Sequence, residues 1–228
     1  MSAARGLLRP ARQATYDRVF GVVHTGLMTN VLLALACAPL PAALALVRDP
    51  LASWPFFAVL SLLCAPALTG AFGCFAALEH GSVLRAFWDG YRRGAGRALA
   101  VWAAATAAVS VLVVDAVVVA ATPWGPALVP FFAAAAMLVV AVALALLVVI
   151  AETPRGVRPR RLVLPCLWLT ARRWYLAPVN VAVLGLAVAV ISVRPVIGML
   201  VACAPLLYAV WANTRYVVAS LLPRPSGA

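Results

Sequence analysis

The residues of this sequence whose types suit binding or proton chemistry are few, and three of them lie inside long apolar stretches. Asp115, Asn30 and Asn180 are surrounded by apolar residues, where an ionisable or amide side chain is costly and is therefore a candidate for contacting a solute or a proton. For Asp115 the structural alternative is an ion pair with Arg194 or Arg48. For the two asparagines it is a hydrogen bond between helices.

The sequence contains none of the arrangements that common catalytic and cofactor sites require. A phosphate-binding glycine loop, an H-E-x-x-H helix, a nucleophile elbow and a paired-carboxylate motif are all missing. The five cysteines include no C-x-x-C, and the two histidines, His24 and His80, are not at metal-ligand spacing. We therefore expect a protein that is not an enzyme and that has no cofactor and no metal site.

The elements that must position these residues are predicted to be membrane-spanning helices. Of the 228 residues, 66% are hydrophobic and only 11% are charged, which leaves too little polar surface for a water-soluble protein. A helix needs roughly 20 apolar residues to cross a hydrocarbon core of about 30 Å. We expect an all-α, polytopic membrane protein with six transmembrane helices, at about residues 19–47, 51–78, 98–121, 126–151, 174–193 and 195–222.

The distribution of positive charge predicts how these spans are oriented. The net charge is +12 and all 18 cations are arginines, of which all but Arg48 and Arg194 fall on one side when the loops are assigned alternately. The positive-inside rule then places both termini in the cytoplasm, as a basic segment at 1–18, a transmembrane domain at 19–222 and a tail at 223–228. This fits multi-pass insertion in the inner (cytoplasmic) membrane and contact with anionic headgroups. It does not fit nucleic-acid binding, because the arginines flank apolar spans.

Two inner loops carry similar aromatic and basic residues. A hydrophobic residue, a tryptophan and an Arg-Arg pair recur at the same spacing in residues 79–97 and again around residues 162–170, and we expect both segments to form interfacial helices. The pattern has two interpretations, a docking surface for a cytoplasmic partner or an anchor on lipid headgroups. The candidate docking residues are Trp88, Arg92, Arg93, Trp168, Arg172 and Arg173.

The tripeptide Cys-Ala-Pro occurs three times, each time inside a predicted span. The copies begin at Cys37, Cys64 and Cys203, and the proline of each removes a backbone hydrogen bond and is expected to bend its helix. Bent helices can line an intramembrane cavity, although the abundance of Ala and Pro in this chain also explains the repetition. Gly70 and Gly73 in the second span are expected to allow close helix packing.

Several segments resemble the YesL-like family of bacterial membrane proteins, also known as domain of unknown function 624. They are Asn30 with Leu40-Pro41, the run Pro66-Ala67-Leu68-Thr69-Gly70-Ala71, and the run Ala86-Phe87-Trp88-Asp89-Gly90-Tyr91-Arg92-Arg93. The resemblance implies a multi-helix inner-membrane protein, often encoded beside carbohydrate import systems. It implies no catalytic residues.

The function expected from these features is an accessory role in solute transport, with carbohydrate as the solute. The protein would act through its cytoplasmic face on an ABC-type import permease or ATPase. The alternative is an independent transporter or binder of a small solute or lipid, which would use Asp115, Asn30 and the bent helices as its site.

Overall fold

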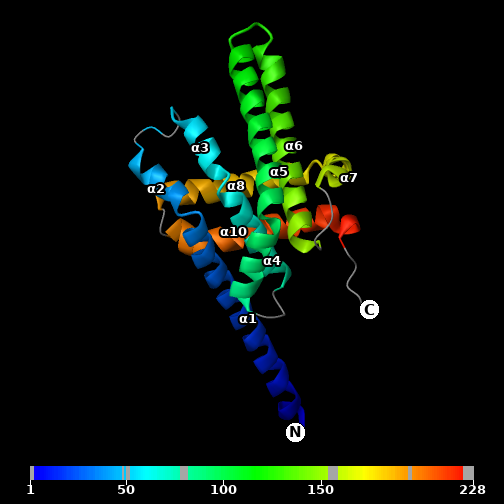
Figure 1. The fold of residues 1–228 in the computed structure, drawn as a ribbon. Helices are drawn as coiled ribbons and strands as arrows, with labels where there is room; N and C mark the ends of the chain where they lie inside the picture. The colour runs from blue at the N-terminus through cyan, green and yellow to red at the C-terminus, as the bar shows by residue number, and fades with distance from the viewer. Residues whose placement is uncertain are drawn as a thin grey trace.

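The computed structural model describes residues 3–47, 49, 52–77, 82–153, 159–194 and 197–222, and all the regular structure in these ranges is helical. Figure 1 shows the arrangement of the helices. Their bounds are α1 (Ala3–Ala36), α2 (Pro39–Leu46), α3 (Trp54–Ser61), α4 (Cys64–Ala76), α5 (Val83–Ala120), α6 (Gly125–Glu152), α7 (Pro159–Arg172), α8 (Leu176–Val193), the π-helix η1 (Gly198–Ala202), α10 (Cys203–Val218) and the 3₁₀ turn η2 (Ala219–Leu221). The predicted all-α class is confirmed.

Three of the described helices are long and apolar enough to cross a membrane. They are α5, α6 and α8, and α3 with α4 would make a fourth span, bent by 43°, if the two are taken together. The apolar part of α1 is shorter, from Phe20 to Ala36, and the last predicted span is divided between η1 and α10. The chain therefore has several apolar helices of spanning length, as a multi-pass membrane protein requires, and three or four of the six predicted spans are supported.

The helices at the predicted spans do not all run in one direction. α5 and α6 form a long antiparallel pair that projects beyond the rest of the molecule, whereas α8 and α10 run across the direction of that pair (Figure 1). Hydrogen bonds from Asn180 and Asn213 join α8 to α10. These polar contacts hold α8 and α10 together.

One predicted interfacial helix is part of a longer element. Residues 83–97 continue without interruption into the predicted span that follows them, so that α5 runs for 38 residues from Val83 to Ala120. The prediction of a separate helix over 79–97 is therefore corrected for the described part of that segment. Its glycines do not end the helix because Gly90 and Gly94 face α4 at short distance. The other predicted interfacial segment does form a separate helix, α7.

All three Cys-Ala-Pro copies lie where one helix ends and the next begins, and the predicted bend is confirmed at Cys64, where α3 and α4 meet at 43°. Cys37 follows the end of α1, Cys64 begins α4 after the break that ends α3, and Cys203 begins α10 after η1. The proline of each copy falls in the first turn of the following helix, where its missing N–H removes no hydrogen bond within that helix.

α4 packs against the first half of α5 at backbone distance, as predicted for Gly70. A Cβ at Gly90 would lie 2.9 Å from the Thr69 carbonyl oxygen, and one at Gly70 would lie 3.0 Å from the Phe87 carbonyl oxygen. Phe72 and Phe87 are buried beside this contact, together with residues 144–149 of α6. The core therefore sits at the level where α4, α5, α6 and α10 meet.

Candidate functional site

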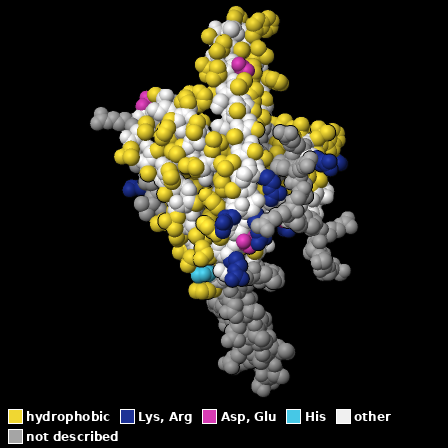
Figure 2. Space-filling view, in the orientation of Figure 1, with side chains coloured by type: hydrophobic (Ala, Val, Ile, Leu, Met, Phe, Trp, Pro, Cys, Tyr) yellow, Lys and Arg dark blue, Asp and Glu magenta, His cyan; other side chains and the backbone are white. Residues whose placement is uncertain are grey.

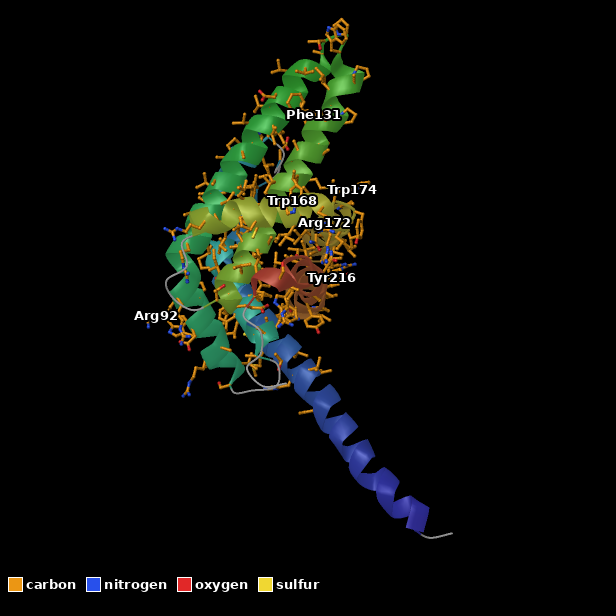
Figure 3. All side chains as sticks on the ribbon, turned by 90° about the vertical axis from the view of Figure 1, so that its right-hand side faces the viewer. Arg92, Phe131, Trp168, Arg172, Trp174 and Tyr216 are labelled. Atoms are coloured by element: carbon orange, nitrogen blue, oxygen red, sulfur yellow. The ribbon has the colours of Figure 1, made fainter. Side chains whose placement is uncertain are left out.

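The end of α7 and the start of α8 present an aromatic–basic surface, which we define as Trp168, Arg172, Arg173, Trp174, Tyr175 and Tyr216. α7 ends at Arg172, and a tight turn leads directly into α8 at Leu176, so these side chains are presented close together. Trp168 is 69% exposed and Trp174 is 66% exposed. Figure 3 shows Trp168, Arg172, Trp174 and Tyr216 on one side of the molecule.

Tyr216 of α10 holds one arginine of this surface in place. The Arg173 guanidinium lies 4.3 Å from the centre of the Tyr216 ring, and its Nη1 donates to the Tyr216 carbonyl oxygen at 2.6 Å. A cation over an aromatic face is attracted by the ring quadrupole. Arg173 is thus committed to a contact within the protein, whereas Arg172 is exposed.

α7 has the character of an interfacial helix. Leu164 and Trp168 are exposed on one of its faces while Cys166 and Thr170 are buried on the other, and arginines lie near both ends. In Figures 1 and 3 the helix lies crosswise to the α5–α6 pair. A helix with an apolar outer face and flanking arginines suits the plane of a membrane interface.

A second aromatic–basic cluster lies near the start of α5 and consists of Trp88, Tyr91, Arg92 and Arg93. Trp88 is 54% exposed and stacks on Tyr91, and the Arg92 guanidinium lies 5.7 Å from the centre of the Trp88 ring. Arg93 forms an ion pair with Asp89 one turn away. The two Arg-Arg pairs are therefore alike in one respect, since each has one arginine held by a neighbouring group.

The structure does not bring the two repeated elements together. In Figure 3 Arg92 and Arg172 lie at opposite edges of the molecule. Each cluster is accordingly a surface of its own, built on a different pair of helices.

Asn30 is a structural residue at the break between η1 and α10. Its Oδ1 accepts a hydrogen bond from the Ala204 N–H at 2.5 Å, and its Nδ2 donates to the Val201 carbonyl at 3.2 Å. Val201 lies four residues before Pro205, whose ring nitrogen has no hydrogen to donate to that carbonyl. Asn30 is 2% exposed. Its amide therefore replaces hydrogen bonds that the break removes.

Asn180 is likewise occupied by partners within the protein. Its Nδ2 donates to Thr214 Oγ1 at 3.1 Å, and its Oδ1 accepts from Asn213 Nδ2 at 2.7 Å. The adjoining cavity measures about 10 Å³, which is room for about one water molecule. Thr170 lines the same cavity, and its buried hydroxyl has no hydrogen-bond partner among the described residues. No solute of carbohydrate size fits there.

Asp115 lies on the projecting part of the α5–α6 pair and is exposed. The described residues form two ion pairs, Arg93 with Asp89 and Arg215 with Glu152. Neither includes Asp115, so the predicted pairing with Arg194 is not formed. The alternative partner, Arg48, falls outside the described residues. Asn30, Asn180 and Asp115 therefore do not converge on one site.

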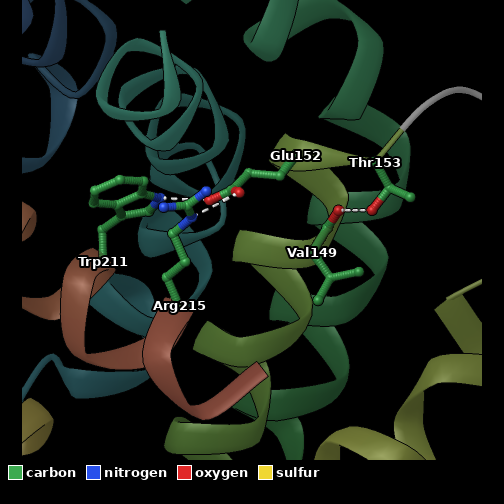
Figure 4. Close-up of polar contacts among 5 residues, drawn as sticks. All are labelled: Val149, Glu152, Thr153, Trp211 and Arg215. Atoms are coloured by element: carbon green, nitrogen blue, oxygen red, sulfur yellow. Dashed lines mark hydrogen bonds and ion pairs between the residues drawn. The ribbon is translucent and has the colours of Figure 1, made fainter. Parts of the chain in front are cut away.

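A polar contact between α6 and α10 is formed by Glu152, Trp211 and Arg215 (Figure 4). Glu152 Oε1 accepts from the Trp211 indole N–H at 2.9 Å, and Oε2 accepts from Arg215 Nε at 3.0 Å. The Arg215 guanidinium also lies 5.3 Å from the centre of the Trp211 ring. Trp211 and Arg215 are 59 and 63 residues from Glu152 along the chain, and the fold brings them beside it.

We expect Glu152→Ala to lower the free energy of unfolding by about 2 kcal/mol, because it leaves a buried indole N–H and an arginine without their acceptor. Glu152→Gln keeps an oxygen acceptor for Trp211 and should cost about 1 kcal/mol, since the ion pair with half-exposed Arg215 contributes little. Thermal unfolding in mild detergent measures both. The matched control is Thr153→Val: its hydroxyl bonds only to the Val149 carbonyl, which the Thr153 N–H also contacts. Equal losses for all three variants would contradict the assignment.

The structure gathers the three Cys-Ala-Pro thiols into one region. Cys37 and Cys203 each lie close enough to Cys64 to interact with it. All five cysteines are free thiols, and the described residues contain no group of three or more Cys, His, Asp or Glu side chains that could hold a metal ion. The convergence is thus a packing of three helix breaks.

Comparisons of the chain with models of protein families, with curated proteins and with solved structures find no match.

Proposed function

We propose that this protein is a multi-pass component of the inner (cytoplasmic) membrane that assists solute import without being an enzyme. It would act by docking an ABC-type import permease or its ATPase through the exposed aromatic–basic clusters of α5 and of α7–α8. The choice of carbohydrate as the solute depends only on the resemblance of Asn30 with Leu40-Pro41 and of residues 66–71 and 86–93 to the YesL-like family. The clusters would also contact anionic lipid headgroups.

One observation supports docking over independent transport. The interior asparagines are hydrogen-bonded within the protein, whereas the tryptophans of the two clusters are exposed at the surface. Asn30 and Asn180 use their amides for contacts between helices, and the cavity beside Asn180 is too small for a solute. Trp88 and Trp168 instead expose more than half of their surface, each close to an exposed arginine. Tryptophan and arginine are the residues that most often dominate binding at protein interfaces.

The test is purification of the tagged protein from its native membrane in mild detergent, followed by mass spectrometry of what accompanies it. We expect stoichiometric recovery of an import permease or its ATPase. The double variant Arg92→Gln/Arg172→Gln should lower that recovery by about tenfold, a loss of about 1.4 kcal/mol in binding. These two arginines are chosen because both are exposed and neither forms a hydrogen bond or an ion pair with another described residue.

The matched control is Arg93→Gln/Arg173→Gln, which removes the same charge from arginines that already have partners, Asp89 and Tyr216. It should lower recovery less. Membrane insertion is checked by resistance to alkaline extraction, because loss of insertion would mean that the arginines are topological anchors. Unchanged recovery in the first variant would overturn docking through these clusters.

The alternative, an independent binder of lipid or solute, is favoured by a different observation, an apolar crevice beside the bent α3–α4 pair. Recovery of the protein alone with a bound lipid or solute would support it in place of docking.

A further inference from the structure

A crevice of about 250 Å³ lies between α3 and the α5–α6 pair. Its walls are Trp54 and Ala58 on α3, a stretch of α5 from Trp102 to Val113, and Val140 and Ala143 on α6. In Figure 1 α3 leans away from α5, so that the two helices diverge from the point where α3 meets α4. The crevice is the space that this divergence leaves.

The divergence is built into the sequence. The break at Cys64-Ala65-Pro66 bends α3 against α4 by 43°. At its narrow end the indole N–H of Trp102 donates to Ser61 Oγ at 3.2 Å, which joins the last residue of α3 to α5. Because α4 is held against α5 at backbone distance, the bend necessarily opens α3 away from the pair.

The chemistry of the walls selects an alkyl chain. No charged residue lines the crevice, and the only polar groups besides the tryptophan N–H atoms are the hydroxyls of Thr106 and Ser110. The Trp102 N–H is already used by Ser61, so a polar solute would lose its hydration and gain almost no partners. The crevice walls likewise offer water few hydrogen-bond partners.

The position of the crevice indicates that the alkyl chain belongs to a membrane lipid. α5 and α6 are both helices of spanning length, so their outer surfaces face hydrocarbon in a bilayer. Figure 2 shows hydrophobic side chains covering most of the projecting pair. From Trp102 to Val113 the rise along α5 is roughly 16 Å. That is about half of a hydrocarbon core of roughly 30 Å, the depth that one lipid chain occupies.

A second hollow continues the first. It measures about 310 Å³, follows α5 from Leu112 to Ala120 and α6 from Val129 to Ala136, and shares Val113 with the crevice. The apolar path along the pair therefore runs beyond the crevice, toward the turn at Trp124. A chain longer than the crevice has somewhere to extend.

We propose that the crevice binds one acyl chain of a membrane phospholipid. This site is separate from the aromatic–basic clusters and does not depend on docking. The bend after α3 would then have a function, because a straight α3–α4 helix would close the space that the acyl chain fills.

The test uses phosphatidylcholine vesicles containing a phosphatidylcholine with a photoreactive diazirine on one acyl chain. After illumination, digestion and mass spectrometry, we expect labelling of the crevice residues of α5 to exceed labelling of the more exposed apolar residues of α8, such as Val188 and Val193, by about tenfold. Unlabelled phospholipid should compete for the crevice. Ala105→Trp, which fills it, should remove the excess.

The matched control is Ala104→Trp, because Ala104 is exposed on the same helix and does not line the crevice. Ala58→Phe fills the crevice from the α3 side and keeps the test valid if Ala105→Trp does not fold. Labelling spread evenly over α5 and α8, or unaffected by either filling variant, would overturn the proposal. A photoreactive amino acid placed at position 54 would also overturn the proposal if it cross-linked to a second copy of the chain, because a protein molecule would then occupy the crevice. Recovery of the import partner is a separate readout that the filling variants should leave unchanged.

Discussion

Replacing Gly90 by alanine is expected to destabilise the protein by about 2–3 kcal/mol, through forced separation of two packed helices. The new Cβ would lie 2.9 Å from the Thr69 carbonyl oxygen and 3.1 Å from the Gly70 Cα. Both neighbours are backbone atoms, so no side-chain rotation can relieve the contact. Alanine is up to about 1 kcal/mol more favourable than glycine inside a helix. The expected destabilisation is the net effect, because the cost of separating the two helices is larger than this gain. Chemical unfolding in detergent micelles gives the free-energy difference.

Gly96, six residues further along α5, is the matched control. Nothing lies within 4 Å of a Cβ placed there, so Gly96→Ala should stabilise the protein by about 0.5–1 kcal/mol. The two variants make the same chemical change in the same helix and should have opposite signs. A neutral Gly90→Ala would show that α4 and α5 do not approach as closely as the structure has them.

The Gly90 contact also matters for the first aromatic–basic cluster. Gly90 turns toward α4, which leaves its neighbours Trp88 and Arg92 facing outward. If Gly90→Ala loosens the α4–α5 contact, docking through Trp88 should weaken even though no residue of the cluster has changed.

The helical class, the proline bends and the close packing at Gly70 could all be predicted from the sequence, because each follows from local chemistry. Apolar length predicts a spanning helix, a proline interrupts the helix before it, and a glycine admits a neighbouring backbone. The continuation of α5 through residues 83–97 could not be predicted in this way. Its aromatic and basic start is typical of a separate interfacial helix, and its packing on α4 becomes evident only in the structure, where it is part of one helix with the following span.

In the candidate site, too, some features follow from local sequence and others depend on the fold. Exposed Trp168 and Arg172 follow from the amphipathic pattern of α7, which predicted an interfacial helix. The partners of the polar residues, such as Tyr216 for Arg173 and Trp211 for Glu152, are 43 and 59 residues away along the chain. Sequence spacing carries no information about such contacts without the fold. The pair of Asp115 with Arg194, one of the two ion pairs considered for Asp115, is not formed for this reason.

Asn30→Leu is expected to lower the free energy of unfolding by about 2–3 kcal/mol, because it leaves the Ala204 N–H and the Val201 carbonyl without partners in a buried position. The variant should leave α1 helical, since leucine is a better helix former than asparagine. The loss therefore reports the contact between α1 and the η1–α10 break. It is measured by thermal or chemical unfolding in mild detergent.

A double-mutant cycle with Pro205→Ala tests the reason for the effect. Alanine at 205 supplies an N–H that can bond to the Val201 carbonyl four residues earlier, as in an ordinary α-helix. In that background Asn30→Leu should cost at least 1 kcal/mol less than in the parent protein, a coupling typical of residues that share a partner. Equal costs in the two backgrounds would mean that Asn30 does not stabilise the break. In that case a buried amide in a spanning region would again need a ligand to explain it.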